Sequence, residues 1–340
     1  MRSFASDNNS GVHPLIMEAL IKADRDHAVG YGDDPWTEVA VGMLKQVFGP
    51  DASPFIVFNG TGANSVALQA VTRPFNSILC AETAHIYVDE CGAPARMSGC
   101  AVVAIPTPDG KLTPELIQPR LHNFGVCHHS QPKAVYISQV SELGTVYTAE
   151  EVRAIADLVH QYGMYLHIDC ARIANACARL DCSLKEITGD AGADIISFGG
   201  TKNGMMMGEA VISFRPEVCE QIVYFRKQSA QLASKMRYLS AQFVPYLEND
   251  LWLENARNAN DKAARLAGIL SKHSSIRFTQ KPESNQLFFT MPAEAARRLA
   301  EKYFFYYWNE SISEVRLVTS WDTTDDDIDK IAEALEEILH

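Results

Sequence analysis

The chain has 340 residues, enough to bury one large core and a second, smaller one, and its 47% hydrophobic and 21% charged residues are typical of a globular protein. A net charge of −12 argues against binding of nucleic acid, which requires a basic face. No apolar run approaches the length of a membrane span, and the polar first residues argue against a secretory signal.

The eight cysteines form no Cys-x-x-Cys pair, and several of them lie in apolar runs. In a chain of this length, that distribution predicts reduced cysteines in the core rather than a zinc site or a disulfide framework. We therefore expect a cytoplasmic protein without a metal site.

Short apolar runs of strand character alternate with helix-like segments from about Pro54 to Phe214. The runs predicted as strands are Phe55–Phe58, Ser77–Cys80, Ala101–Ile105, Ala134–Ser138, Tyr165–Asp169, Asp194–Phe198 and Ala210–Phe214. Helices are predicted at Ala63–Val71 and Thr148–Tyr162. This alternation is typical of an α/β fold with a mostly parallel sheet covered by helices on both faces.

The character of the chain changes after this region. Pro216–Arg257 is rich in helix formers and predicts a long helical segment. Beyond it, strands are predicted at Ile276–Thr279, Gln286–Thr290 and Val315–Thr319, and helices at Ala293–Lys302 and Thr324–Leu339. The acidic run 325–327 fits a helix N-terminus, where carboxylates interact favourably with the helix dipole.

These elements predict two domains. Residues 1–250 would form a large domain and residues 251–340 a smaller α+β domain. The N-terminal segment 1–25 is expected to pack near the small domain.

A glycine loop, residues 59–64, follows the first predicted strand and opens a helix. Gly60 lets the backbone approach an anion, the first helical N–H groups bind phosphate, and Thr61 adds a hydroxyl donor. The same loop nearly matches the dinucleotide-binding motif, because Glu82 follows about 20 residues later, but the third glycine is missing. A plain turn between strand and helix is a third interpretation.

An acid and a lysine lie at two other predicted strand ends, where ligands bind in open α/β sheets. Asp169 closes one strand, and Lys202 lies in the small-residue loop 197–204 after another. A pyridoxal phosphate enzyme needs this pair, because the lysine forms the Schiff base and the acid keeps the pyridine nitrogen protonated. The apolar run 205–207 would help to desolvate the lysine and lower its pKa. Asp169 could instead cap a helix and Lys202 could be an exposed loop lysine, but their joint placement with the glycine loop favours a site.

Three further residues fit such a site. His85 follows a strand end, where a histidine can stack on a cofactor ring or act as a general base. Arg172 could pair with Asp169 or with a ligand anion, and Arg316 suits bidentate capture of a carboxylate. Each of the three also has an ordinary structural explanation, as a loop histidine, a surface arginine or a strand-edge charge.

Together with residues 6–8, 30–35 and 84–86, these segments resemble the low-specificity L-threonine aldolases, in the aspartate-aminotransferase-like superfamily of pyridoxal phosphate enzymes. The most specific parts are His167–Arg172 and Phe198–Gly204. The resemblance covers nearly the whole chain. It implies a fold-type I architecture with a mostly parallel sheet of seven strands. It also implies a homodimer or homotetramer whose site lies at the dimer interface.

The resemblance also implies roles toward pyridoxal 5'-phosphate. Lys202 would be the Schiff-base lysine, Asp169 the partner of the pyridine nitrogen, and His85 the residue that stacks on the ring. Gly60 and Thr61 would bind the phosphate.

Toward a small-molecule substrate, Arg172 would approach the cofactor's 3-oxygen and the substrate carboxylate, which Ser6 and Arg316 would also hold. His128, or His129, lies near the position of a second family histidine beside the substrate hydroxyl. His85 and His128 are therefore the candidates for handling the hydroxyl proton.

The implied reaction is retro-aldol cleavage of L-threonine or L-allo-threonine to glycine and acetaldehyde. Two departures from the family pattern, Ala5 for an arginine and Cys170 for a glycine, leave the substrate range open. Other interpretations are another fold-type I amino-acid lyase that catalyses β-elimination, a dinucleotide-binding oxidoreductase and a non-catalytic relative.

Overall fold

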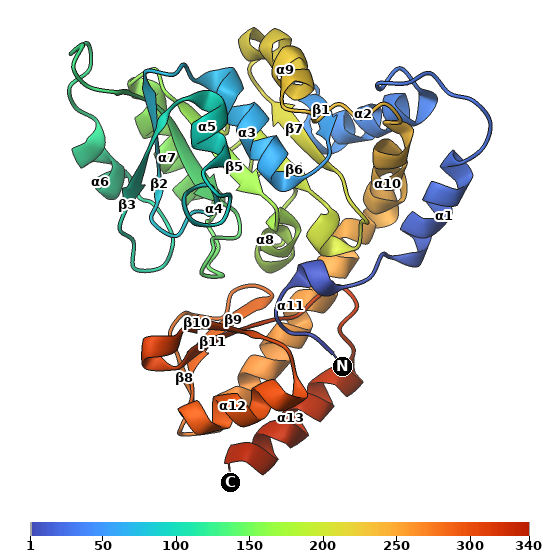
Figure 1. The fold of residues 1–340 in the computed structure, drawn as a ribbon, viewed down its shortest axis with the longest axis vertical. Helices are drawn as coiled ribbons and strands as arrows, with labels where there is room; N and C mark the ends of the chain where they lie inside the picture. Colours follow the sequence, from blue (N-terminus) through green and yellow to red (C-terminus); the bar gives the residue numbers. More distant parts are fainter. Residues whose placement is uncertain (1, 340) are drawn as a thin grey trace.

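Two sheets organise the chain in the computed structural model, which describes residues 2–339 (Figure 1). The larger sheet has seven strands in the order β1-β7-β6-β5-β4-β2-β3. Their bounds are β1 Ser53–Val57, β2 Asn76–Ala81, β3 Ala101–Ile105, β4 Gln131–Ser138, β5 Tyr165–Cys170, β6 Ile195–Gly199 and β7 Glu209–Ser213. The five strands from β3 to β6 are parallel, and β7 runs antiparallel to both β6 and β1. The predicted α/β class with a mostly parallel sheet is confirmed.

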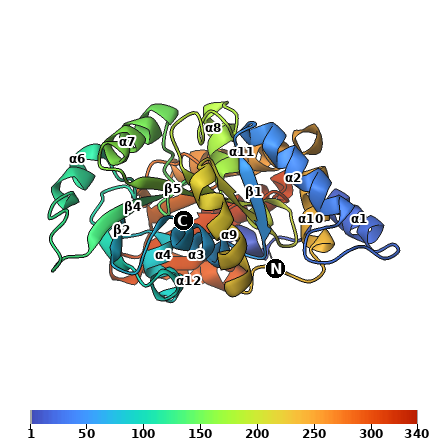
Figure 2. The ribbon, with the colours of Figure 1, turned by 90° about the horizontal axis from the view of Figure 1, so that it is seen from above.

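Helices cover both faces of this sheet, because successive strand residues enter different cores. In β4, for example, Ala134 and Tyr136 belong to one hydrophobic cluster and Val135 and Ile137 to the other. One face is covered by α3 (Gly60–Val71) and α9 (Pro216–Gln228), and α5 (Ala93–Ser98) packs against α3. The other face is covered by four helices: α2 (Pro35–Phe48), α7 (Ala149–Gln161), α8 (Ile173–Leu180) and α10 (Arg237–Leu247). Figure 2 shows α2, α7 and α8 on one side of the strands and α3 and α9 on the other. The short helices α4 (His85–Val88) and α6 (Pro114–Ile117) lie in the connections.

The smaller sheet is antiparallel, with the strand order β10-β11-β9-β8. Its elements are β8 Arg277–Phe278, β9 Gln286–Thr290, β10 Tyr306–Asn309 and β11 Glu314–Val318, accompanied by α12 Ala293–Lys302 and α13 Asp325–Leu339. The acidic run lies in the first turn of α13, as predicted, and the Asp327 amide donates to the Thr324 hydroxyl at 3.1 Å. The strand β10 was not predicted.

One long helix, α11 (Leu251–Leu270), joins the two cores. Trp252 and Ala256 in its first half pack in the core of the large sheet, whereas Leu266 and Leu270 pack in the core of the small sheet. The division of the chain at residue 250 stays a prediction, because a single helix serves both cores.

The segment Pro216–Arg257, predicted as one helical stretch, is divided among α9, α10 and α11. The backbone takes positive φ angles at Ala230 (58°), Asn249 (53°) and Asp250 (58°), which an α-helix cannot accommodate.

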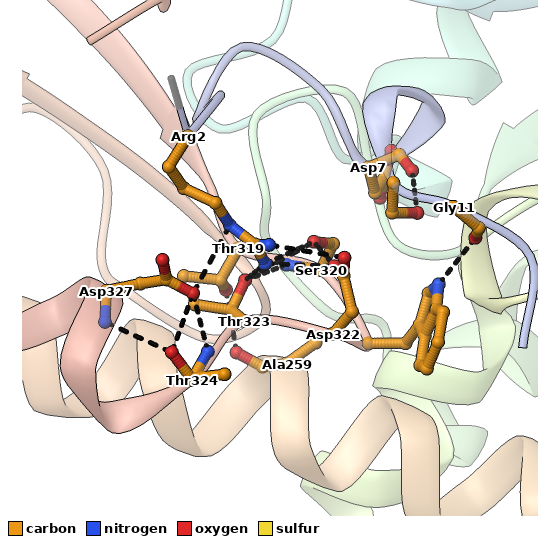
Figure 3. Close-up of polar contacts among 12 residues, drawn as sticks. Arg2, Asp7, Gly11, Ala259, Thr319, Ser320, Asp322, Thr323, Thr324 and Asp327 are labelled. Atoms are coloured by element: carbon orange, nitrogen blue, oxygen red, sulfur yellow. Dashed lines mark hydrogen bonds and ion pairs between the residues drawn. The ribbon is translucent and has the colours of Figure 1, made fainter.

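The N-terminal residues lie along the small sheet (Figure 3). Arg2 forms an ion pair with Asp322 at 2.9 Å, and the carbonyl of the fully buried Phe4 accepts a hydrogen bond from the Val318 amide at 2.8 Å. The Trp321 indole donates to the Gly11 carbonyl at 3.0 Å. Further along, α1 (Pro14–Ala23) packs on α10 of the large domain. The first residues therefore pass from one domain to the other.

All eight cysteines are free. Cys80, Cys100, Cys170 and Cys177 are buried, but Cys91 and Cys127 are exposed, so the prediction of core cysteines is wrong for these two. Among residues 2–339, no helix is both long and apolar enough to cross a membrane. The same residues contain no group of three or more His, Cys, Asp or Glu side chains placed to hold a metal ion.

Candidate active site

A cavity of about 270 Å³ lies beyond the carboxyl ends of the parallel strands. It is lined by five residues that the sequence singled out separately: Gly60, Thr61, His85, Asp169 and Lys202. A second cavity of about 460 Å³ shares His85 and Lys202 with the first and is also lined by Ser6, Arg172 and Arg316. The structure thus brings together every predicted site residue except His128.

Asp169 ends β5 and accepts three hydrogen bonds. The Tyr136 hydroxyl donates at 2.6 Å and the Asn64 amide at 2.9 Å to one carboxylate oxygen, while the Ala171 amide donates to the other at 2.9 Å. Burial alone would raise the pKa of Asp169, but these side-chain donors and the Lys202 charge outweigh it and hold the pKa below its usual value. An ionised carboxylate is what the pyridine nitrogen of a bound cofactor requires.

A buried polar network holds Asn64 in this position. Its amide nitrogen also donates to Glu90 at 2.8 Å, and its carbonyl oxygen accepts from the Ser197 hydroxyl at 2.5 Å. Ser197 is in turn bonded to His167 at 2.8 Å. Burial lowers the pKa of His167 to about 4, so this ring is neutral and serves the network rather than the reaction.

His85 is the first residue of α4 and lines both cavities. Its Nδ1 lies 2.8 Å from the Glu90 carboxylate, whose side chain is fully buried. This hydrogen bond raises the pKa of His85 against the opposing effect of burial. The imidazole is therefore oriented by an acid.

Lys202 lies in a short 3₁₀ turn, Thr201–Asn203, directly after β6. The two preceding glycines are required by packing: a Cβ on Gly199 would lie 1.9 Å from the Glu209 carboxylate, and one on Gly200 would lie 2.2 Å from the Met205 sulfur. Asn203 anchors the other side of the turn by donating to the Tyr246 hydroxyl at 2.9 Å and to the Trp252 carbonyl at 2.7 Å. The backbone around the lysine is thus fixed on both sides.

The glycine loop forms the start of α3, where Asn59 is the N-cap and accepts from the Gly62 amide at 2.8 Å. The first amides of a helix, here those of Gly60 and Thr61, have no intrahelical acceptor and suit an anion. A Cβ on Gly60 would meet no atom within 4 Å, so this residue borders open space. Gly62 differs, because a Cβ there would lie 2.1 Å from the Gln231 side chain. The helix start can therefore hold the phosphate of the cofactor.

The second cavity contains both predicted arginines. Arg172 donates to Asp7 from two nitrogens, at 2.7 and 2.9 Å, so its partner is Asp7 and not Asp169. Arg316 donates to the Ala5 carbonyl at 3.1 Å and lies over the rings of Tyr306 and Trp308, with centroid distances of 5.5 and 5.1 Å. Ser6 also lines this cavity. Two cationic groups and a hydroxyl there suit a carboxylate ligand.

His128 and His129 lie in the loop before β4, at the amino ends of the parallel strands. His129 lines a separate pocket there, together with Ser77 and Leu79 of β2. Within one chain, therefore, neither histidine reaches the cavities, and the expected second histidine beside the substrate hydroxyl is not present in them.

Sequence reasoning missed several residues at the site. Tyr136 and Glu90 support Asp169 and His85, as described above. Two further carboxylates line the first cavity: Glu142, in the loop after β4, and Glu209, in β7, which accepts from the Thr201 hydroxyl at 2.7 Å. Burial raises the pKa of Glu209 to about 8.

A lysine after one strand, an acid at the end of its neighbour and a helix start suited to phosphate define the class of fold-type I pyridoxal phosphate enzymes, and the residues present fit that cofactor. Solved structures agree with this assignment. The threonine aldolase of Leishmania major superimposes with a TM-score of 0.95, at 30% identity and with 100% of both chains covered. A mutant aspartate aminotransferase of Thermus thermophilus shares the fold, with a TM-score of 0.71 at 18% identity over 97% of this chain and 89% of that one.

The family model described as beta-eliminating lyase matches residues 3–294, and the chain belongs to that family. It is 40% identical over 338 residues to the low specificity L-threonine aldolase of Pseudomonas aeruginosa, covering 99% of this chain and 97% of the relative. The protein of that name from Escherichia coli is 25% identical, with 98% of this chain and 97% of the relative covered. The resemblance to threonine aldolases is confirmed, and the chain is a pyridoxal phosphate-dependent lyase.

Proposed function

We propose that this protein cleaves L-threonine and L-allo-threonine to glycine and acetaldehyde by a retro-aldol reaction. One observation carries the proposal: the cavity that unites Lys202 with Asp169 opens onto a second cavity that contains Arg172 and Arg316. The first provides for a cofactor and the second for the carboxylate of an amino acid. The names of the relatives, threonine aldolases from bacteria and from Leishmania, support the same substrate class.

Lys202 would hold pyridoxal phosphate covalently, and the start of α3 would hold its phosphate. When bound, the cofactor supplies a sink for the electron pair that remains on Cα after bond cleavage. Asp169 contributes by staying ionised, since Tyr136 and Asn64 donate to it. His85, held by its hydrogen bond with Glu90, would cover the ring.

The substrate carboxylate would bind between Arg172, Arg316 and Ser6. The ion pair with Asp7 commits two nitrogens of Arg172 and fixes the plane of its guanidinium. Arg316 is held by the Ala5 carbonyl and by two aromatic rings. A fixed carboxylate limits rotation about Cα and so helps to decide which bond is broken.

The test uses the purified protein reconstituted with pyridoxal phosphate. We expect a near-ultraviolet to visible absorption band from the held cofactor, and release of acetaldehyde and glycine from L-threonine. Formation of 2-oxobutanoate and ammonia instead would support the alternative of a β-eliminating lyase. An absent band would contradict the proposal altogether.

Lys202→Ala should abolish both the band and turnover, because no other lysine lines the cavity within residues 2–339. Lys330→Ala, a matched change on the outer face of α13, should leave both unchanged. Turnover that survives Lys202→Ala would show that another group carries the cofactor.

We further propose a cytoplasmic homodimer or homotetramer with the site at the dimer interface. Exposed apolar side chains beside the cavity support the assembly, among them Phe58 in the cavity wall and Met206 after the lysine turn. The eight free cysteines support a reducing compartment.

A further inference from the structure

Glu142 lies in the loop that follows β4 and lines both cavities, between the residues assigned to the cofactor and those assigned to the substrate carboxylate. Within residues 2–339 its side chain forms no hydrogen bond and no ion pair. The side chain is half-buried, and a half-buried carboxylate without a partner at the junction of two cavities points to a ligand.

Charged and titratable groups surround Glu142 from several elements. Those that face it are Lys202, Arg172, His85, Asp169, Arg316 and Tyr136. Burial raises the pKa of Glu142, opposed first by the charges of Lys202 and Arg172. A carboxylate that binds its proton more tightly than usual is a stronger base, and its strength is closer to what proton transfer near neutral pH requires.

The other candidate bases at the site are already engaged. Asp169 accepts three hydrogen bonds, and Asp7 is committed to Arg172. His85 already uses its Nδ1 in the 2.8 Å hydrogen bond with Glu90. His128 lies at the opposite edge of the sheet. Glu209 lines the first cavity only and accepts a hydrogen bond from Thr201. Among residues 2–339, Glu142 is therefore the carboxylate that borders both cavities and has no hydrogen-bond partner.

We propose that Glu142 is the general base that removes the β-hydroxyl proton of the substrate. This inference rests on the proposed retro-aldol function. The carboxylate takes the hydroxyl proton, and the O–H electron pair becomes the second C–O bond of acetaldehyde. The Cα–Cβ bond breaks, and its electron pair stays with Cα. A proton then adds to Cα to give glycine, and Glu142 returns its own proton to the solvent, so that protons balance.

The role predicts a dependence on pH. The base acts only when it is ionised, so cleavage should fall as the pH drops through the pKa of Glu142, which lies above the ordinary glutamate value. Glu142→Asp keeps a carboxylate, so the variant should cleave more slowly but show the same loss of rate at low pH. Glu142→Gln should lose most of the cleavage rate, and the remaining rate should no longer fall at low pH.

The decisive experiment compares two reactions of the holoenzyme. Cleavage of L-threonine requires a base at the β-hydroxyl, whereas exchange of the glycine α-proton with D₂O, followed by NMR, has no β-hydroxyl to deprotonate. Glu142→Gln should lower cleavage by about 10²- to 10⁴-fold and leave glycine exchange and the cofactor absorption close to wild type. Glu115→Gln makes the same change at an exposed position in α6 and should affect neither reaction.

The outcomes separate the two proposals. Undiminished cleavage by Glu142→Gln would overturn the role of Glu142 alone. Equal loss of cleavage and glycine exchange would also overturn it, because the residue would then support the site as a whole. A wild-type holoenzyme that releases no acetaldehyde would overturn the proposed function, and this inference with it.

Discussion

Asp169 is the last but one residue of β5, and Glu142 follows the neighbouring strand β4. Both border the same cavity, yet their surroundings shift their pKa values in opposite directions. Asp169 accepts hydrogen bonds from Tyr136, Asn64 and the Ala171 amide, and its pKa is lowered. Glu142 accepts none within residues 2–339, and burial raises its pKa. One carboxylate is thereby kept as a permanent charge and the other is left free to exchange a proton.

Asp169→Asn should separate the contribution of this side chain to the reaction rate from its contribution to cofactor binding. The amide keeps the size of the carboxylate but not the charge that stabilises a protonated pyridine nitrogen. We expect kcat to fall by about 10²- to 10³-fold with a much smaller change in cofactor affinity. Measurement of kcat alongside the cofactor Kd checks this. A loss of rate that merely follows loss of cofactor would contradict the assigned role.

The strand pattern predicted that Gly60, Asp169 and Lys202 come together, because residues at the carboxyl ends of parallel strands reach the same edge of a sheet. It could not predict their supports. The Asn64–Asp169 hydrogen bond joins residues 105 positions apart, and no local pattern marks such a pair. Within one chain, His128 precedes β4 and lies at the opposite edge of the sheet, and its role beside the substrate hydroxyl stays a prediction.

At the scale of elements, two helix N-termini show that the same capping interaction stabilises a helix in one place and borders a binding cavity in another. The N-cap of α7 is Thr148, which forms a reciprocal capping box with Glu151 at 2.8 and 3.2 Å. The N-cap of α3 is Asn59, which accepts from the Gly62 amide and also lines the cavity. Only the second helix start faces a ligand site.

Asn59→Ala and Thr148→Ala form a matched pair. Each removes one cap and should lower the free energy of unfolding by about 1 kcal/mol, as measured by chemical denaturation. Only Asn59→Ala should weaken cofactor binding, because it loosens the turn whose amides hold the phosphate. Equal cofactor affinity in the two variants would show that the α3 start does not bind it.

The sequence located seven strands of the large sheet and three of the small one because buried strands carry continuous apolar runs. It missed β10, whose Tyr306 and Tyr307 are exposed at the edge of the sheet and belong to an unbroken aromatic run without alternation. It also missed the breaks in Pro216–Arg257. The first break depends on a positive φ at Ala230, and alanine gives no sequence signal for a turn. The second lies at Asn249 and Asp250, residue types that do favour turns.

At the scale of the whole molecule, the second cavity is built from three parts of the chain that lie far apart in sequence. Ser6 comes from the N-terminal residues, Arg172 from the large domain and Arg316 from the small sheet. The N-terminal residues connect the two, because Arg2 pairs with Asp322 in the small domain (Figure 3). Asp7 in turn pairs with Arg172 in the large domain. The second cavity, and with it the proposed carboxylate site, therefore exists only when both domains are in place.

The proposed assembly is testable at an apolar groove that adjoins the catalytic cavity. Met17 and Ile21 of α1 line this groove with Met206 and Met207, and Met207 also lines the first cavity. Ile21 is 64% exposed, which is unusual for a large apolar side chain unless a partner covers it. A second copy of the chain seated there would border the active site.

Ile21→Glu should therefore weaken both assembly and catalysis, because a carboxylate in an apolar interface has no partner. Wild type should sediment at 75.2 kDa or more, twice the 37.6 kDa of one chain, and the variant should shift toward a single chain with a loss of turnover. Ile312→Glu places the same charge on an exposed turn of the small domain and should change neither property. A wild-type protein that is fully active as a single chain would contradict a site at the interface.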